Sequence, residues 1–378
     1  MRLCVGAAFA YALLLLSGAA CTQRHAAEPA AVRLPVIDPA TDYGKGVSAL
    51  AAGEIDGTLI IAGGANFPDT PAAEGGQKRF YDDIWILPAG ADEWLPAGKM
   101  PAPAAYAAVY ALADRIIVAG GADSGGSRDG VFEISLTRSA CDGERCDGLD
   151  GEFVIVTPLP SLPAPIEQAA AAHDGATLYL AGGLSDGTPS TAVYRCVLAS
   201  GDMLWERIAE LPEPVVQPVA AVCGGRLYVW GGFDPVEKRS SAGGLLLDLA
   251  TGSWSRIGGL PDGGTLTGAA AVQETGGRLW VVGGVDREIF DMAINLPPER
   301  TAEYLSQPVG YYRFRPQIMV FDPATGVWSE FARTEHAARA GAAAVITPRG
   351  VAIINGELKP GIRSAESVII ETTNLRTR

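Results

Sequence analysis

The sequence predicts an all-β fold, a six-bladed β-propeller whose ring is closed by the N-terminal strand. Three observations predict it. An apolar run that ends in two small residues recurs along the chain, most copies lead on to a strand with a tryptophan, and the last copy lacks a strand that the N-terminus can supply. The 378 residues include 47 Gly and 26 Pro, and 48% are hydrophobic against 19% charged. This composition favours many short strands joined by turns around a sizeable core.

The recurring unit is an apolar strand followed by a pair of small residues. Its six copies end at Gly63-Gly64, Gly120-Gly121, Gly182-Gly183, Gly231-Gly232, Gly283-Gly284 and, in a degenerate form, Asn355-Gly356. Their spacing of roughly 50 to 70 residues is close to the ~50 of kelch repeats and longer than the ~40–45 of WD40 blades. Because 47 glycines form some adjacent pairs by chance, the flanking strands have to carry the assignment.

Each apolar strand has similar neighbours in the sequence. A strand of small residues precedes it, as in Ala104–Val109 and Ala338–Val345, and two further strands follow. Small residues suit strands that crowd around an axis, and a tryptophan covers the outer part of a blade. Four strands in each of six copies make a kelch-type propeller. The tryptophans that mark outer strands are Trp94, Trp205, Trp254 and Trp328.

The sixth copy supplies only three strands. Its apolar strand, Val351–Ile354, and its third strand, Ser367–Ile370, leave no room for an outer strand before residue 378. The segment Ala31–Val36 precedes the first blade and contains the Leu-Pro step that ends outer strands elsewhere. We expect it to complete the last blade, which removes an exposed sheet edge. Residues 32–378 then form a single propeller.

Residues 1–20 have the features of an export signal, since Arg2 is followed by an apolar stretch and then by the small residues Ser17–Ala20. Cys21 resembles the lipid acceptor of bacterial lipoproteins, and residues 21–31 would be a tether. The expected location is the periplasm, with the protein either free or held to the membrane by a lipid on Cys21. No later segment approaches the ~20 apolar residues that a membrane-spanning helix needs.

The charge balance argues against one class of partners. The chain has 29 Lys and Arg against 43 Asp and Glu, and its net charge is −14. This is the wrong sign for holding nucleic acid or an anionic membrane through bulk charge. Nucleic acid is therefore not an expected partner.

Four cysteines lie beyond Cys21. Cys141 and Cys146 flank a polar loop in which a local disulfide suits an exported protein, with a metal site as the alternative. Cys196 and Cys223 lie in apolar strands and are expected to be free thiols. Only three histidines are present, and one falls in the tether. They are too few for a metal or radical oxidase of the galactose-oxidase kind, so no metal ion is expected.

One copy breaks the repeat at a position near the axis. The residue after the small pair is uncharged in five copies and is an acid, Glu357, in the sixth. A blade does not need a carboxylate there, and the loop after this strand opens onto one face of the ring. The same loop holds Lys359 and Arg363 and is stiffened by Pro360. It is either a ligand-binding site or only a salt bridge, because paired charges also occur for structural reasons.

The run from Asn355 to Arg363, Asn-Gly-Glu-Leu-Lys-Pro-Gly-Ile-Arg, resembles a motif of the bacterial N-acetylneuraminate epimerases, or sialic acid mutarotases. These are exported six-bladed kelch propellers. The segments Ile61–Phe67, Gly75–Ile84 and Gly283–Asp286 match as well, so the resemblance covers nearly the whole mature chain. In the better known members the Glu-to-Arg loop precedes the blade that corresponds to Ile61–Phe67. This chain therefore resembles a circularly permuted branch, in which the closure point moves around the ring and the site does not.

The resemblance implies an isomerase that needs no cofactor and interconverts the α and β anomers of free sialic acid. It implies that Glu357 is the catalytic proton acceptor and Arg363 its essential partner. A base takes the proton of the anomeric hydroxyl, an acid protonates the ring oxygen, and the opened ring recloses on the other face. Arg363 is a candidate for anchoring the carboxylate on the anomeric carbon or for stabilising charge. Because the net charge of −14 repels such an anion, cations are expected at the mouth of the channel.

Further side chains are candidates for contacting the substrate. Gln168 and Gln217 occupy equivalent inner strands near the axis, although such amides also bond to backbone. Asn66 follows a glycine pair, where a turn also suits asparagine. The insertion Asp286–Arg315 has short-helix character at Pro298–Leu305 and either caps the channel or forms a solvent loop. The predicted substrate-binding residues are Lys359, Asn66, Gln217 and Gln168.

Two other classes of function compete with this interpretation. A non-catalytic kelch module of the cell envelope that binds carbohydrate or protein would not need Glu357. Substitution of Glu357 would leave binding by such a module intact. A sialidase would carry a Ser-x-Asp-x-Gly-x-Thr-Trp repeat, which this sequence lacks. Hydrolysis is therefore not expected.

Overall fold

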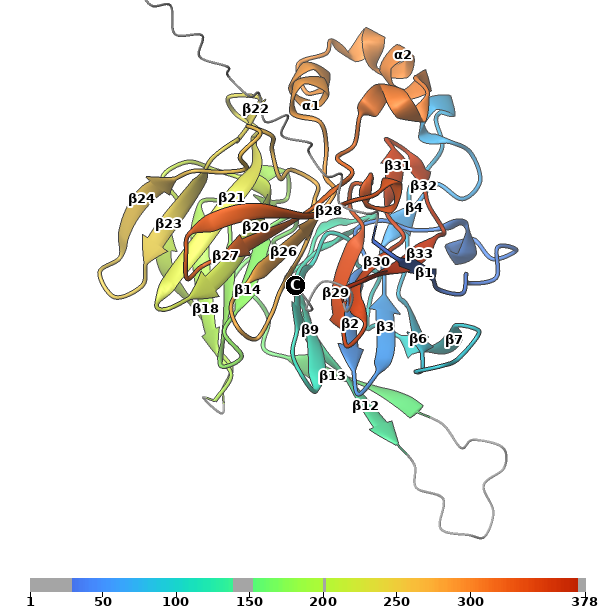
Figure 1. Cartoon of the computed structure of the whole chain (residues 1–378), viewed down its shortest axis with the longest axis horizontal. Coiled ribbons are helices and arrows are strands. Elements are labelled where there is room, and N and C mark those ends of the chain that lie inside the picture. The colour runs from blue at the N-terminus through green and yellow to red at the C-terminus, as the bar shows by residue number, and fades with distance from the viewer. Residues whose placement is uncertain (1–28, 139–151, 200–201, 373–378) are drawn as a thin grey trace, which may run out of the picture.

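Six antiparallel sheets form a ring in the computed structural model, which describes residues 29–138, 152–199 and 202–372 (Figure 1). Blade 1 contains β2 (Ala51–Ile55), β3 (Thr58–Ala62), β6 (Asp83–Leu87) and β7 (Leu95–Lys99), and blade 2 contains β8 (Ala108–Ala111), β9 (Arg115–Ala119), β12 (Val131–Arg138) and β13 (Glu152–Leu159). Blade 3 contains β14 (Ala170–His173), β15 (Thr177–Ala181), β18 (Ala192–Val197) and β19 (Trp205–Glu210), and blade 4 contains β20 (Val216–Cys223), β21 (Arg226–Asp234), β23 (Gly244–Asp248) and β24 (Ser253–Ile257). Blade 5 contains β25 (Ala270–Gln273), β26 (Leu279–Val282), β27 (Gln317–Asp322) and β28 (Val327–Arg333), and blade 6 contains β29 (Ala343–Thr347), β30 (Gly350–Ile354), β33 (Ser367–Glu371) and β1 (Ala31–Arg33). The innermost strands contact one another in the cyclic order β2, β8, β14, β20, β25, β29 and back to β2, so the fold is the predicted six-bladed kelch-type β-propeller.

Short hairpins and helices follow the small pairs at one end of the ring. The hairpin strands are β4 (Ala65–Asn66) with β5 (Arg79–Phe80), β10 (Ala122–Asp123) with β11 (Gly126–Ser127), β16 (Leu184–Ser185) with β17 (Thr188–Pro189), β22 (Arg239–Ser240) with the end of β21, and β31 (Glu357–Lys359) with β32 (Ile362–Arg363). The helical elements after small pairs are η2 (Ala72–Glu74), α1 (Arg287–Ala293), η3 (Pro298–Arg300), α2 (Thr301–Ser306) and η4 (Val309–Tyr312). Two others, η1 (Tyr43–Lys45) and η5 (Glu335–Ala337), come before the innermost strands β2 and β29.

The N-terminal strand closes the ring, as the sequence predicts. β1 pairs antiparallel with β33, and the sheet order β1-β33-β30-β29 places it at the outer edge of blade 6. It begins at Ala31, one residue before the expected start of the propeller. Trp94 Nε1 donates a 2.9 Å hydrogen bond to the carbonyl of Pro35. The segment after β1 is therefore tied to blade 1 as well, which fastens both sides of the closure.

The hydrophobic core lies between the blades. Each cluster of buried side chains in the described residues joins two neighbouring blades. Neighbouring residues of one strand point into different clusters, since Ile60 packs toward blade 2 and Ile61 toward blade 6. Because both faces of the strand are buried, the repeat is a continuous apolar run and does not alternate.

The small pairs turn the chain in a conformation that residues with a Cβ avoid. In the first copy a Cβ on Gly63 would lie 2.3 Å from a backbone oxygen. The degenerate copy keeps the turn, with φ of 51° at Asn355 and 100° at Gly356. Asparagine is one of the few residues that tolerate the left-handed region. Glu357 therefore follows the turn in the same way as the equivalent residues of the other copies. It forms an isolated β-bridge with Ala340, which lies just before the innermost strand of the same blade.

The cysteine predictions are tested in part. Cys196 is buried, Cys223 is partly buried, and both are free thiols. Cys141, Cys146 and the export signal with Cys21 lie outside the described residues. Within the described ranges, no helix combines the length and the apolar character needed to cross a membrane.

A charged network fastens the last blade and makes its stability depend on pH. The guanidinium of Arg339, 2% exposed, donates to the carbonyl of Asn355 at 2.8 Å, to the carbonyl of Glu366 at 2.6 Å and to the Glu366 carboxylate at 2.6 Å. Burial by itself would raise the pKa of Glu366. The hydrogen bond with His336 and the charge of Arg339 outweigh burial, so the pKa of this carboxyl lies below its ordinary value.

We expect Glu366→Gln to flatten the loss of stability in acid. A carboxyl whose pKa is lowered by folding stabilises the protein above its unfolded pKa and loses that contribution as the pH falls through the folded pKa. At pH 7 the substitution should cost about 2 kcal/mol, since the buried Arg339 loses a charged partner. Urea unfolding at pH 7 and pH 4 measures both effects. If the free energy of unfolding of the wild type and of Glu366→Gln depends on pH to the same extent, Glu366 is not the source of the loss of stability in acid.

Candidate active site

A cavity of about 510 Å³ runs along the axis of the ring. Its walls are mostly small side chains of the innermost strands, and its volume falls in the range of about 300–1,000 Å³ that is usual for ligand sites. The insertion covers the end that carries the hairpins, since Phe290 of α1 and Tyr304 of α2 line the cavity. Figure 1 shows both helices, in orange, above the ring. The structure therefore confirms that the insertion caps the channel.

A ring of six residues, one from each blade, surrounds the cavity where the innermost strands begin; five of them precede their strand by two residues, and Gln217 is the second residue of β20. All six have φ between 56° and 68° and line the cavity. Backbone hydrogen bonds of 2.7–3.0 Å link these residues from blade to blade everywhere except between Gln217 and Gly268, for example from Tyr106 N to Ala49 O and from Gln217 N to Gln168 O. The members of this axial ring are Ala49, Tyr106, Gln168, Gln217, Gly268 and Gly341.

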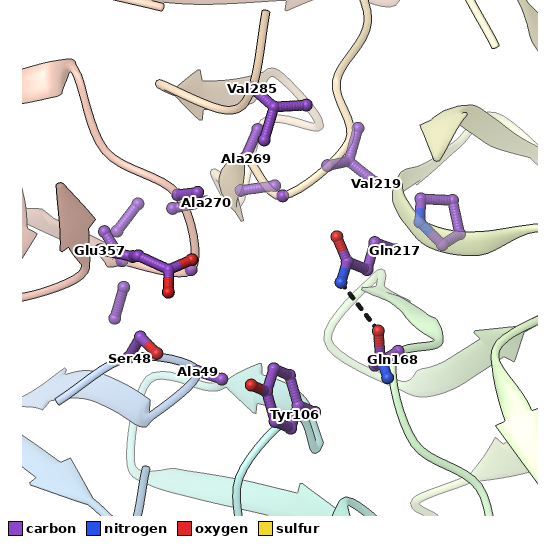
Figure 2. A pocket seen from close by; sticks show the side chains of 18 of the residues that line it. Ser48, Ala49, Tyr106, Gln168, Gln217, Val219, Ala269, Ala270, Val285 and Glu357 are labelled. Carbon is purple, nitrogen blue, oxygen red and sulfur yellow. Dashed lines mark hydrogen bonds between the residues drawn. The ribbon is translucent and has the colours of Figure 1, made fainter. Parts of the chain in front are cut away.

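The axial ring carries long polar side chains on one side, and on the other side two of its members are glycines. Tyr106, Gln168 and Gln217 carry long polar side chains, whereas the two glycines belong to blades 5 and 6. Figure 2 shows the Glu357 carboxylate projecting into the cavity from the blade 6 side, across from the two glutamines. Three residues of the ring adopt the same left-handed backbone with a large side chain, so the glycines are not required by conformation alone. Their absence of side chains leaves space beside Glu357.

The β31–β32 hairpin sets the position of Glu357. Glu357 and Arg363 are direct cross-strand partners, which brings their side chains together on one face. Glu357 Oε1 accepts hydrogen bonds from Arg363 Nη1 and, at 2.9 Å, from the backbone N–H of Gly361. No donor to Oε2 lies within the part of the chain that the structure describes. This oxygen is therefore available to a ligand.

Arg363 lies behind Glu357. Its side chain is 4% exposed, against 23% for Glu357, and it does not line the cavity. Nε donates to the carbonyl of Ala65 at 3.3 Å, and the guanidinium lies 5.5 Å from the centre of the Phe67 ring. Direct anchoring of a substrate carboxylate by Arg363 does not fit this geometry. Of the two roles expected from the sequence, the stabilisation of charge on Glu357 does.

Two predicted substrate-binding residues hold the scaffold. Lys359 Nζ donates to the carbonyls of Leu305 at 3.1 Å and Gln307 at 2.7 Å, and so ties the cap to the hairpin. Asn66 is 2% exposed, with its amide donating to two backbone carbonyls and its oxygen accepting from Tyr81. Neither residue lines the cavity. Their polar atoms are engaged within the protein, and their contact with a substrate stays a prediction.

Gln168 and Gln217 both line the cavity. Gln217 Nε2 donates to Gln168 Oε1 at 2.8 Å, and Gln168 Nε2 donates to Glu167 at 3.1 Å. This chain of hydrogen bonds orients both amides. Their contact with a substrate stays a prediction.

Sequence reasoning missed several cavity residues. Tyr106 occupies the same place in the repeat as Gln168 and Gln217, so an alignment of the six copies could have found it. Tyr304 and Tyr312 of the cap also line the cavity, and no repeat marks them. Burial, together with the neighbouring tyrosines and the charge of Glu357, raises the pKa of both phenols, so both keep their protons at neutral pH.

A second carboxylate at the cavity, Asp286, is already engaged. Its side chain caps α1 by accepting from Ile289 N at 3.0 Å, and it accepts from Arg313 at 2.9 Å. Glu357, with one oxygen held and the other facing the cavity, is the better placed of the two acids to accept a proton.

Residues 159–377, more than half of the chain, match the family model of N-acetylneuraminate epimerase. The chain belongs to the N-acetylneuraminate epimerase family. The range that matches this family includes the β31–β32 hairpin, the cap, Gln168 and Gln217.

Individual relatives are distant. The chain is 30% identical over 102 residues to N-acetylneuraminate epimerase of Haemophilus influenzae (strain PittEE), covering 24% of this chain and 27% of that protein. It is 32% identical over 105 residues to the enzyme of that name from Pasteurella multocida (strain Pm70), covering 25% and 28%. The matched segments thus span little more than a quarter of these relatives.

The solved structure of YjhT covers 90% of this chain and 98% of its own, with a TM-score of 0.57 and 13% identity. At this identity the likeness shows the fold alone. The permuted order of the blades stays a prediction.

Proposed function

We propose that this protein is a mutarotase that interconverts the α and β anomers of free N-acetylneuraminate. The observation that carries the proposal is the place of Glu357, a carboxylate held by Arg363 and Gly361 on one oxygen and open to a capped axial cavity on the other. Membership of the N-acetylneuraminate epimerase family supports the substrate.

The proposed reaction moves two protons and breaks one ring bond. Glu357 takes the proton of the anomeric hydroxyl while the ring oxygen gains a proton, and the bond between the anomeric carbon and the ring oxygen breaks to leave an open-chain ketone. Rotation of that carbonyl and the reverse transfers close the ring on the other face. The Tyr304 hydroxyl or a water can supply the second proton. These transfers need no cofactor and no metal ion.

The cellular role follows from the first 20 residues, which support export to the periplasm. There the protein would supply whichever anomer an uptake system consumes. Its partner is a small sugar acid, and a lipid on Cys21 would be its sole attachment to the membrane.

Exchange NMR tests the proposal. Magnetisation transfer between the α and β signals of N-acetylneuraminate should speed up in proportion to protein concentration, and neutral ketoses should respond less. No acceleration on any sugar would overturn the proposal and favour a non-catalytic carbohydrate- or protein-binding module.

A further inference from the structure

A sugar acid brings a negative charge that the lining of the cavity does not match. None of the described residues that line the cavity is a lysine or an arginine. The substrate carboxylate is bonded to the anomeric carbon, so it comes close to Glu357 whenever Glu357 reaches the anomeric hydroxyl. Two neighbouring carboxylates repel each other, and the net charge of −14 adds to the repulsion. Binding therefore requires a cation close to the wall of the cavity.

Most cations near the cavity already have partners. Arg363 is paired with Glu357, Lys359 with the carbonyls of the cap, and Arg313 with Asp286. Lys78 differs from them. In the described ranges it makes no ion pair, and its Nζ donates a 3.0 Å hydrogen bond to the hydroxyl of Tyr106.

The surroundings of Lys78 hold its charge beside the cavity. Nζ lies 5.2 Å from the ring centre of Tyr106, 5.8 Å from that of Phe67 and 5.9 Å from that of Phe80. Attraction between an ammonium and aromatic faces restrains a side chain that would otherwise move freely in solvent. Tyr106 itself lines the cavity, and Figure 2 shows its ring facing the same space as Glu357 and Ser48.

We propose that Lys78 and the Tyr106 hydroxyl form the site that binds the carboxylate of the sugar acid. This inference rests on the proposed function and names its anion-binding residues. The Tyr106 oxygen accepts from Lys78, so its own proton is free to be donated into the cavity. The ammonium has three donors and uses one of them on Tyr106. A carboxylate at this point would receive an O–H and an N–H hydrogen bond, both stronger than neutral ones.

The arrangement gives each carboxylate its own cation. Arg363 balances Glu357 from behind the hairpin, and Lys78 balances the substrate from the Tyr106 side. Glu357 can thus lie close to an anionic substrate. A sugar without the carboxylate would gain nothing from Lys78.

Lys78→Met removes the charge and keeps most of the stem, and Tyr106→Phe removes only the hydroxyl. Arg79→Gln is the matched control, since Arg79 is the next residue in the chain, carries the same charge and pairs with Asp42 and Asp69 away from the cavity. Two ligands separate binding from chemistry. One is N-acetylneuraminate with hydrogen in place of the anomeric hydroxyl, which cannot open its ring, and the other is the methyl ester of N-acetylneuraminate, which lacks the charge.

The expected result is a Kd for the 2-deoxy acid, and a KM for N-acetylneuraminate, about ten- to a hundredfold higher in Lys78→Met with kcat nearly unchanged. Tyr106→Phe should give a smaller rise, Lys78→Arg should restore most of the affinity, and Arg79→Gln should match the wild type. The methyl ester should not distinguish Lys78→Met from the wild type.

Equal Kd values for the 2-deoxy acid in Lys78→Met and the wild type would overturn the inference even if anomer exchange is catalysed. A wild-type protein that binds the acid through Lys78 without accelerating exchange would refute the proposed function alone.

Discussion

Glu357→Gln is expected to lower the protein's acceleration of anomer exchange by about 10²–10⁴-fold, the usual contribution of a positioned general base. An amide has nearly the size of the carboxylate and can still accept from Gly361 N, which donates to Glu357 at 2.9 Å. It cannot take a proton at neutral pH. The loss should therefore appear in kcat, with the fold little changed and the Kd for the 2-deoxy acid no higher than in the wild type, because the repulsion between the two carboxylates is removed.

Asp286→Asn is the matched control. Among the described residues that line the cavity, Asp286 is the other carboxylate, and asparagine caps a helix about as well as aspartate. The exchange rate of this variant should stay within a few-fold of the wild type. A Glu357→Gln protein that exchanges anomers at the wild-type rate would end the case for a general base at this position and leave a binding role for the cavity.

The blades were predictable because burial on both faces leaves a strong trace in the sequence. Leu59, Ile60 and Ile61 all pack between blades, and such a run differs from the alternating pattern of a half-exposed strand. Closure was predictable for a related reason, since an unpaired edge beside β33 would be costly in a ring. Glu357 stood out because the equivalent residue is uncharged in the five other copies, so the blade itself does not require a carboxylate at this position.

The partners of the polar side chains could not be predicted. Asn66 and Lys359 are polar residues in loops near the axis, as a ligand-binding residue would be. Their hydrogen-bond partners lie at least 15 residues away in the sequence, Asp42, Tyr81 and Leu305 among them. No spacing in the sequence encodes these encounters. The same holds for Arg363, whose burial depends on Phe67 and Ala65 at the other end of the chain.

Arg363→Ala is expected to slow anomer exchange by about 10²-fold, since misplacing a reacting group by about 1 Å can cost that much. It should also lower the free energy of unfolding by about 3 kcal/mol, because Glu357 loses a partner that is 4% exposed. Arg363→Lys should recover part of both. A lysine can reach one carboxylate oxygen, but it cannot bond to Glu357 and to the Ala65 carbonyl with the fixed fork of a guanidinium.

A double-variant cycle decides whether Arg363 acts through Glu357 or on the substrate. If Arg363 only holds the carboxylate in place, it has nothing left to position once Glu357 is a glutamine. The Glu357→Gln, Arg363→Ala protein should then exchange anomers no more slowly than Glu357→Gln alone. If Arg363 instead binds the substrate, the two losses should multiply, as they do for independent contributions. In that case the double variant should also have a higher Kd for the 2-deoxy acid than Glu357→Gln alone. A positioning residue buried behind the hairpin should instead leave that Kd unchanged, because Lys78 would bind the carboxylate.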